Sequence, residues 1–418
     1  MYATTLPAAP SLATNSLRAP MPDRLARRRA VAPSGVALPA DVRWPWACRA
    51  LDRTGLRLIP DDGAAPSVGD LVVVEVVRVR NHTGLVAATN ERLRLYEGTR
   101  FVGVLGHRYA TDAFEAEFDA TPLAERDTLH LVTNGGMVSV VQSRATGVKA
   151  PTELRFLGYV ATPDGARINT KTRLAPPVGT LAPVSLPPVL LGVGSGMNAG
   201  KTTSVVRMVQ ALVRRGVRVA VCKVTGSVSH RDLFEMQATG ACFARDFSDY
   251  GYPSTYLASE DEIRALFRRM MADAAQTAPD VIVVEIADGV LQRETAWLLA
   301  DDEVRAATAG VVLAAGCALS AIAGLVEVES YGHEVVAVTG CLTSAPLFVR
   351  EFASRRPDVT VASSAGDGSA LADAALDVLA SEATPQPTGP APTLAQGDGQ
   401  ATPAPVLAVS AFLPCGAD

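Results

Sequence analysis

One short stretch restricts the fold of this chain more than any other. The apolar run VLLGVG is followed by the loop GSGMNAGKT and then by a helical pattern, KTTSVVRMVQALVRRG. A glycine-rich loop between a buried strand and a helix presents backbone N–H groups without partners and the positive end of a helix dipole, which attract anions. The core Gly200-Lys201-Thr202 is typical of a phosphate-binding loop, or P-loop. A purely structural turn is the alternative.

This loop carries the groups that bind a nucleoside triphosphate with magnesium. Lys201 can reach the β- and γ-phosphates as a point charge, and the hydroxyl of Thr202 can join the Mg²⁺ shell. Thr203 is a candidate for a contact with the α-phosphate. The residues predicted to bind the nucleotide are consecutive: Gly194, Ser195, Gly196, Met197, Asn198, Ala199, Gly200, Lys201, Thr202 and Thr203.

The second half of the chain alternates apolar runs with helical patterns. After VLLGVG come VRVAVCK, PDVIVVEIADG, GVVLAAG and HEVVAVTG, with helix-like segments such as EDEIRALFRRMMADAAQ between them. The run VIVVEI lacks the polar alternation of a half-solvated strand, so both faces of the sheet should be covered. We predict an α/β P-loop NTPase domain with a mostly parallel sheet over residues 189–380.

The first half of the chain has a different hydrophobic pattern. Runs such as LVVVEVVRVR and ELRFLGYVATPDGARINT combine β-branched residues with Gly, Asn and Asp turns, which predicts a small mainly-β barrel or sandwich over residues 41–175. The pattern breaks at GHRYATDAFEAE, where His107, Arg108, Asp112 and Glu115 crowd one stretch. Polar sites on loops have this form. A solvated loop with internal ion pairs is the alternative.

Composition indicates the nature of the remaining segments and which classes of partner are unfavourable. Residues 1–40 and 381–418 are Pro- and Ala-rich, which predicts a disordered tail and a low-complexity tail, and the proline-rich residues 176–188 predict a linker. A net charge of -5 argues against nucleic acid or an anionic membrane as a partner. Six scattered cysteines, the lack of a membrane-spanning run and the lack of a signal-like start predict a cytoplasmic protein with reduced thiols.

The loop also suggests a family. GSGMNAGKT resembles the GTGTDVGKT loop of dethiobiotin synthetase and its relatives, which also have a hydroxyl residue at the first variable position. That resemblance covers about the last half of the chain. It implies that the strand end at Lys223 matches a Lys-Pro motif, that Asp232 helps to hold magnesium, and that Glu285 and Gly289 match the ends of a Glu-Gly-Ala-Gly-Gly motif. It further implies ATP and Mg²⁺ as cofactors.

Sheet geometry brings the same residues together without reference to a family. In a doubly wound sheet the carboxyl ends of neighbouring strands open onto one crevice, so Lys201, Lys223 and Glu285 should be neighbours there. Two lysines and a magnesium ion can neutralise a transferring phosphoryl group. We therefore predict Lys201, Lys223 and Glu285 as catalytic residues. The metal ligands are predicted to be Thr202, Asp232 and Glu285, with Asp232 taken from the resemblance.

Three further loops are candidates for the site. The stretch ARDFSDYGYPSTYL could recognise substrate, act as a switch, or be an ordinary aromatic-anchored connection. Asp288, Arg293 and Glu294 follow Glu285 closely and could form the opposite wall. VTGCLTSAP ends a late strand where such domains receive the base, and the chain lacks the Asn-Lys-x-Asp signature that selects guanine, which favours adenine.

Three functions compete. The first is an ATP-dependent enzyme, of ligase or phosphoryl-transfer type, that acts on a small molecule. The second is a nucleotide-dependent switch or carrier similar to those that assist molybdenum-cofactor assembly. The third keeps the P-loop for structure and assigns function to the HRYATD loop. The sequence leaves the acceptor and the oligomeric state open, with a homodimer as one alternative.

Overall fold

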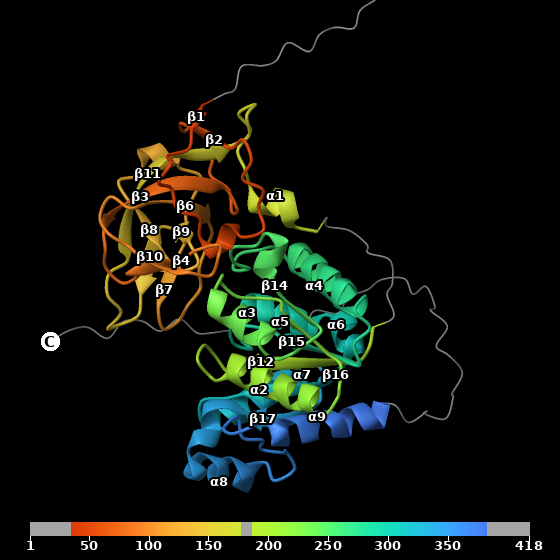
Figure 1. The fold of residues 1–418 in the computed structure, drawn as a ribbon. Helices are drawn as coiled ribbons and strands as arrows, with labels where there is room; N and C mark the ends of the chain where they lie inside the picture. The colour runs from red at the N-terminus through yellow and green to blue at the C-terminus, as the bar shows by residue number, and fades with distance from the viewer. Residues whose placement is uncertain (1–34, 177–185, 383–418) are drawn as a thin grey trace, which may run out of the picture.

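The computed structural model describes residues 35–176 and 186–382, which form two parts stacked end to end (Figure 1). We call residues 35–176 the β-domain and residues 186–382 the α/β domain. Most of the expected tails at 1–40 and 381–418 and of the expected linker at 176–188 lies outside the described residues. Inside the range of the first tail, Val36–Ala37 forms a short strand that pairs antiparallel with residues 57–58.

The β-domain is built around a closed barrel, which decides between the two predicted alternatives. Five strands follow one another in the order β11-β3-β6-β9-β8, and β8 pairs back to β11. Only the β6–β9 pairing in this ring is parallel. The strands of the domain are β1 (Val36–Ala37), β2 (Arg57–Ile59), β3 (Leu71–Arg78), β4 (Gly84–Val86), β5 (Arg92–Arg94), β6 (Arg100–Leu105), β7 (Phe114–Ala116), β8 (Leu129–Leu131), β9 (Met137–Ser139), β10 (Val141–Arg144) and β11 (Thr152–Ala161).

Strand β3 shows why this domain forms. Its residues Leu71–Val74 are all fully buried, because side chains that alternate across the strand enter two different cores. Val72 and Val74 join one hydrophobic cluster, while Leu71 and Val73 join another. The short helical segments η1 (Trp46–Cys48), η2 (Leu123–Glu125) and α1 (Thr170–Leu174) complete the domain.

The α/β domain contains a six-stranded sheet in the order β14-β13-β15-β12-β16-β17, and all five strand pairings are parallel. Its strands are β12 (Val189–Gly194), β13 (Val219–Lys223), β14 (Phe243–Asp246), β15 (Val281–Glu285), β16 (Thr308–Ala314) and β17 (Val335–Thr339). Strand β12 and the loop after it lie at the centre of this sheet, so the P-loop projects from the middle of its carboxyl edge.

Helices cover both faces of the sheet, as its apolar strands require. One face packs against α2, α3 and α9, and the other packs against α4 to α8. The helices of this domain are α2 (Lys201–Arg214), α3 (His230–Gln237), η3 (Phe247–Tyr250), α4 (Glu260–Ala275), α5 (Arg293–Ala300), α6 (Asp302–Ala307), α7 (Ala318–Ser330), η4 (Gly340–Ser344), α8 (Pro346–Arg355) and α9 (Ser369–Glu382). Within the described ranges, none of these helices combines the length and apolar character needed to cross a bilayer.

An ion-pair cluster joins the two domains. Arg49 of the β-domain donates to Asp249 at 2.6 Å and to Ser248 at 3.0 Å, and its guanidinium lies 3.4 Å from the buried Asp246. Burial raises the pKa of Asp246, and the charge of Arg49 opposes that shift. Thr170 also donates to the carbonyl of Gly251 at 2.7 Å. The stretch 246–252 therefore contacts the β-domain directly.

Arg49→Ala tests this contact. We expect it to lower the free energy of unfolding by about 3–5 kcal/mol, because it leaves the carboxylate of Asp246 buried without its cation. Urea denaturation at pH 7 measures the effect. Arg305→Ala, which removes an exposed pair with Asp302, is the control and should change stability by roughly 0.5 kcal/mol or less. Equal losses in the two variants would contradict a stabilising role for Arg49.

Candidate functional site

The loop between β12 and α2 is held in the shape of a phosphate cradle. Asn198 and Gly200 adopt left-handed backbone conformations, with φ of 58° and 101°. A side chain on Gly200 would come within 2.9 Å of the Cα of Gly340. At Gly194 an added Cβ would lie 2.7 Å from the side chain of Lys201, so the glycine lets Lys201 fold back over the loop. The Lys201 ammonium then donates to the carbonyl of Gly196 at 2.8 Å.

The first turn of α2 keeps its donors free. Within the described residues, the backbone N–H groups of Lys201, Thr202 and Thr203 have no acceptor, whereas Ser204 already donates to the carbonyl of Gly200 at 3.0 Å. Free N–H groups and a buried ammonium at one helix N-terminus form a ready site for phosphate oxygens. Burial lowers the pKa of Lys201, and the carboxylates of Asp288 and Glu285 oppose this.

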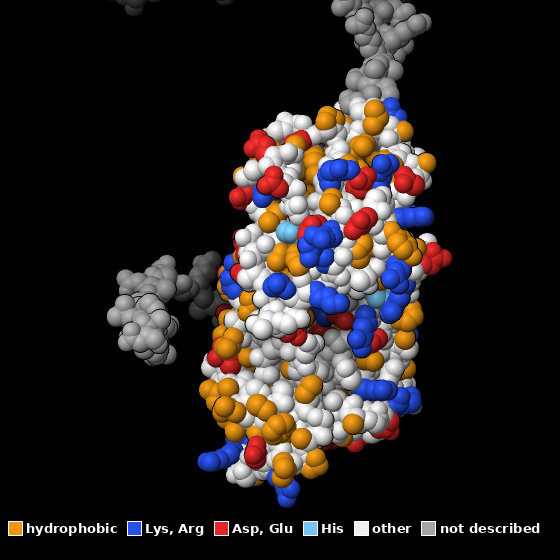
Figure 2. Space-filling view, turned by 90° about the vertical axis from the view of Figure 1, so that its left-hand side faces the viewer, with side chains coloured by type: hydrophobic (Ala, Val, Ile, Leu, Met, Phe, Trp, Pro, Cys, Tyr) orange, Lys and Arg blue, Asp and Glu red, His pale blue; other side chains and the backbone are white. Residues whose placement is uncertain are grey.

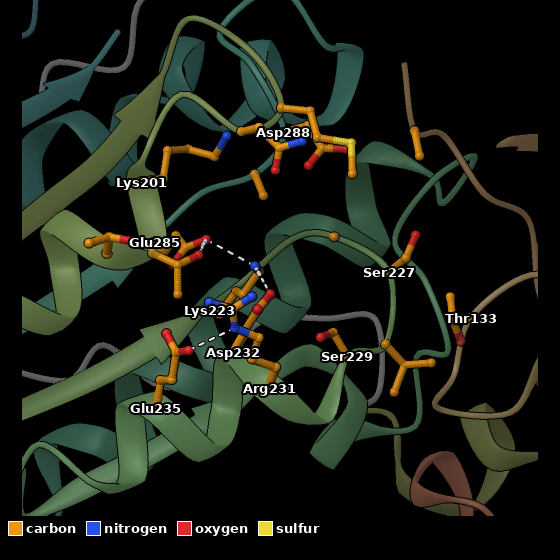
Figure 3. Close-up of a pocket in the computed structure, with 18 of the residues that line it drawn as sticks. Thr133, Lys201, Lys223, Ser227, Ser229, Arg231, Asp232, Glu235, Glu285 and Asp288 are labelled. Carbon is orange, nitrogen blue, oxygen red and sulfur yellow. Dashed lines mark hydrogen bonds and ion pairs between the residues drawn. The ribbon is translucent and has the colours of Figure 1, made fainter. Parts of the chain in front are cut away.

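A charged cluster forms where β13 and β15 end. The two strands are adjacent and parallel, and their register pairs Lys223 with Glu285. The ammonium of Lys223 lies 2.6 Å from Asp232 Oδ2 on α3 and 2.9 Å from Glu285 Oε1 (Figure 3). The same Glu285 oxygen accepts a hydrogen bond of 3.0 Å from the Thr202 hydroxyl. The strand ends thus connect directly to the P-loop.

The electrostatics of this cluster follow from its charges. Burial alone would lower the pKa of Lys223, but Asp232 and Glu285 raise it above its ordinary value. Burial would raise the pKa of Asp232, yet the charge and hydrogen bond of Lys223 hold it below the usual range. At neutral pH the ammonium of Lys223 is therefore charged, and the carboxylate of Asp232 beside it is ionised.

One oxygen of the cluster is left over. Glu285 is fully buried, and its Oε2 has no hydrogen-bond partner among the described residues. A buried carboxylate oxygen without a partner is costly unless a ligand satisfies it. The described residues contain no group of three or more His, Cys, Asp or Glu side chains arranged for a metal ion. Mg²⁺ in nucleotide sites needs only one or two carboxylates, a hydroxyl and phosphate oxygens, so Thr202 and Glu285, with Asp232 near them, fit it.

These groups line a cavity of about 500 Å³ between the two domains. Figure 2 shows this region as a hollow with acidic side chains inside it and basic side chains around it. In Figure 3 Lys201 and Glu285 lie on one side of the cavity, with Ser227 and Thr133 opposite them. The lining comprises Arg108, Tyr109, Ala110, Thr133, Met197, Asn198, Gly200, Lys201, Thr202, Thr203, Lys223, Gly226, Ser227, Val228, Ser229, Arg231, Asp232, Glu235, Glu285, Ala287, Asp288 and Cys341.

The structure brings the predicted catalytic and metal residues together. Lys201, Lys223 and Glu285 line one cavity with Thr202 and Asp232. Of the ten predicted nucleotide-binding residues, Gly194, Ser195, Gly196 and Ala199 shape the loop without lining the cavity, and the other six line it. The pairing of Lys223 with both carboxylates was not predicted, because it depends on where α3 lies.

Of the other site residues predicted from the sequence, some line the cavity and some lie outside it. Arg108, Asp288 and, from VTGCLTSAP, Cys341 line the cavity. Arg293 and Glu294 do not line it, and the buried Glu294 instead accepts from the backbone N–H of Leu257 at 2.9 Å.

The remaining β-domain candidates contact other protein side chains, of which only the partner of Asp112 belongs to the α/β domain. Asp112 is bonded by the side-chain amide of Asn198, His107 packs on the ring of Phe118, and Glu115 accepts from Ser143 at 2.6 Å. Sequence reasoning missed Thr133, which sits in the short turn between β8 and β9. No signal in that turn shows that it faces another domain.

Comparison with known proteins gives partial likenesses only. No protein-family model matches the chain, and no curated protein matches it. Among solved structures, the 54 kDa signal recognition particle protein from Aeropyrum pernix K1, in complex with GDP, is 17% identical over 48% of this chain and 48% of that chain, with a TM-score of 0.31. The match thus spans about half of that protein.

Two other solved structures are similar at the same level. A DUF1611 family protein from Anabaena variabilis is 13% identical over 51% of this chain and 64% of that chain, with a TM-score of 0.34. HypB from Helicobacter pylori, in complex with nickel, is 12% identical over 47% of this chain and 88% of that chain, with a TM-score of 0.32. Function therefore has to be argued from the geometry of the site.

Lys223→Met tests the charge cluster. We expect the free energy of unfolding to fall by about 3–5 kcal/mol at pH 7, because the buried carboxylate of Glu285 and the partly buried carboxylate of Asp232 lose their cation. Urea denaturation measures this loss, with the exposed Lys149→Met as the control.

The same variant has a predicted pH dependence. In the wild type Asp232 has a lowered pKa, so its stabilising contribution is present above its unfolded-state pKa of about 3.9 and is lost as the pH falls through its folded-state value. In Lys223→Met the largest causes that lower this pKa are gone, and burial, which raises it and penalises the ionised form, is opposed only by the charges of Arg231 and His230. The stability difference should therefore shrink between pH 7 and pH 4. A constant difference would contradict this account.

Proposed function

We propose that this chain binds a nucleoside triphosphate with magnesium, ATP in our assignment, and is an ATP-dependent enzyme that acts on a small molecule. One observation carries the proposal. The hydroxyl that follows the P-loop lysine, Thr202 Oγ1, lies 3.0 Å from a buried carboxylate, Glu285, whose second oxygen lacks a partner in the described residues. The hydroxyl of Thr202, the carboxylate of Glu285 and the ammonium of Lys201 line one cavity, where a triphosphate would contact its cation.

Each part of the site has a role in this proposal. The N–H groups of Lys201, Thr202 and Thr203 and the Lys201 ammonium receive the β- and γ-phosphates. Thr202 and Glu285, with Asp232, hold magnesium, which neutralises phosphate charge when it is bound. Lys223 keeps Asp232 and Glu285 oriented toward that position, and its own charge adds to the positive field around the γ-phosphate.

The size and position of the cavity favour a transfer to an acceptor. It extends from the P-loop to the β-domain, and a volume of about 500 Å³ is in the range of small-molecule sites. An acceptor beside Asp288 would lie next to the γ-phosphate, and this proximity supports ligase or phosphoryl-transfer chemistry. The resemblance to dethiobiotin synthetase agrees with this reaction class and leaves the acceptor open.

A switch or carrier is the second candidate, and the domain contact favours it. Strand β13 leads to Lys223 in the site, and its neighbour β14 leads to Asp246 and Asp249, which hold Arg49. A nucleotide that moved Lys223 could therefore bias the position of the β-domain. Steady-state phosphate release separates the two functions. Stimulation by a small molecule supports the enzyme, and stimulation only by a protein supports the switch.

Lys201→Ala tests nucleotide binding. We expect the wild type to gain thermal stability with magnesium and a non-hydrolysable ATP analogue, and the variant to lose that gain while it keeps its fold. Thermal unfolding followed by circular dichroism measures both properties, with Lys149→Ala as the matched control. A guanine analogue in parallel tests the base. If neither analogue stabilises the wild type, the function proposed here is wrong and the HRYATD-loop hypothesis gains support.

Thr202→Val tests the metal site. The substitution keeps the shape of the side chain and removes the hydroxyl, so we expect the nucleotide affinity to lose most of its dependence on Mg²⁺. Titration of a fluorescent ATP analogue with and without EDTA measures this dependence. Thr203→Val should retain the dependence. The same dependence in Thr202→Val and wild type would exclude Thr202 as a ligand.

A further inference from the structure

The β-domain reaches into the cavity through the loop that the sequence singled out. This loop, residues 106–113, connects β6 to β7, and its residues Arg108, Tyr109 and Ala110 line the cavity together with Met197 and Asn198 of the P-loop. None of the nucleotide-binding roles above uses Arg108. Arg108 therefore has no role in the proposed nucleotide binding, although the β-domain places this basic side chain in the cavity.

The position of this loop is fixed from both sides. The Asn198 side chain at the tip of the P-loop donates to Asp112. Arg108 exchanges two backbone hydrogen bonds with Ala116, at 2.7 Å and 2.9 Å. The ring of Tyr109 lies 5.4 Å from the ring of Tyr256 in the α/β domain. Arg108 is therefore held at a defined place relative to the phosphate cradle.

The guanidinium of Arg108 has donors to spare. A guanidinium carries five N–H donors in a planar fork. Arg108 Nη1 donates to the carbonyl of Val132, Nε is buried without a partner, and Nη2 makes no hydrogen bond within the described residues. Burial lowers the pKa of Arg108, and Asp288 and Asp112 oppose that shift. An arginine stays protonated at neutral pH, so the N–H groups of Arg108 that have no partner can donate to an anionic ligand.

Two cations and a carboxylate, Lys201, Arg108 and Asp288, line the same cavity. The carboxylate of Asp288 raises the pKa of both Lys201 and Arg108, so it lies within electrostatic reach of the two cations. Lys201 marks the phosphate end, and Arg108 marks the end formed by the β-domain. A ligand group at Arg108 would therefore share one cavity with the γ-phosphate and with Asp288.

We propose that Arg108 binds a carboxylate of the acceptor, in a subsite completed by Tyr109, Thr133 and Ser227, so that the substrate is a small carboxylic acid. This rests on the proposed function. A single guanidinium beside an aspartate matches a monoanionic carboxylate, which can accept two parallel N–H bonds. A phosphate dianion carries a second negative charge, which a single guanidinium beside Asp288 would leave unneutralised. The hydroxyl of Thr133 lies across from Lys201 in the cavity (Figure 3).

The test uses the full chain, loaded with Mg²⁺ and a non-hydrolysable ATP analogue. Succinate, glutarate and inorganic phosphate are titrated by calorimetry. We expect at least one of the two dicarboxylates to bind wild type more tightly than phosphate does. Arg108→Gln should weaken that binding by about tenfold or more, as the loss of a charged hydrogen-bond partner implies. Arg108→Lys should recover part of it, and the affinity for the ATP analogue should stay within about twofold of wild type.

A matched control lies on the same cavity. Arg231 is exposed, pairs with Glu235 at 2.8 Å, and also lines the cavity. Arg231→Gln should retain the dicarboxylate binding. Failure of both dicarboxylates to bind loaded wild type, tighter binding of phosphate, or equal losses in Arg108→Gln and Arg231→Gln would each overturn the inference. Failure of the ATP analogue itself to bind wild type would instead overturn the proposed function.

Discussion

The ammonium group of Lys223 is the contact on which the site depends. It ends strand β13, and it binds one carboxylate from the neighbouring strand β15 and one from helix α3. Without it, Asp232 and Glu285 would repel each other next to a phosphate-binding loop. With it, the fully buried carboxylate of Glu285 has a cation beside it and accepts from Thr202 at the start of α2. One lysine therefore connects three elements and prepares a cation site beside the P-loop.

The second constraint is the way the domains meet. The Arg49 cluster and the Asn198–Asp112 bond hold the β-domain over the carboxyl edge of the parallel sheet. A P-loop domain alone would leave that edge open to water. The β-domain covers it, and a cavity with charged walls results, in which electrostatic interactions are stronger than in bulk solvent. The barrel supplies the wall opposite the phosphate cradle.

Much of the α/β domain could be predicted from local patterns. The sequence VLLGVGSGMNAGKT identifies the strand, the loop and the helix start, because each depends on residues close together in the chain. Lys201, Lys223 and Glu285 could be placed in one crevice because parallel strands end at one edge. The stretch 246–252 looked equally suited to a substrate or switch loop and to a structural connection, and its contact with Arg49 about 200 residues away could not be predicted from either reading.

The sequence by itself determined the P-loop, the parallel arrangement around it and the residue types that meet a phosphate, because these follow from periodicity and from spacing within one strand–loop–helix unit. Only the tertiary structure decided that Lys223 would pair with both carboxylates and that Glu285 would keep one oxygen without a partner among the described residues. It also decided that Arg108 and Thr133 would line the cavity beside the P-loop. These features depend on packing between segments that are distant in the chain. Local patterns carry no information about how such surfaces fit together.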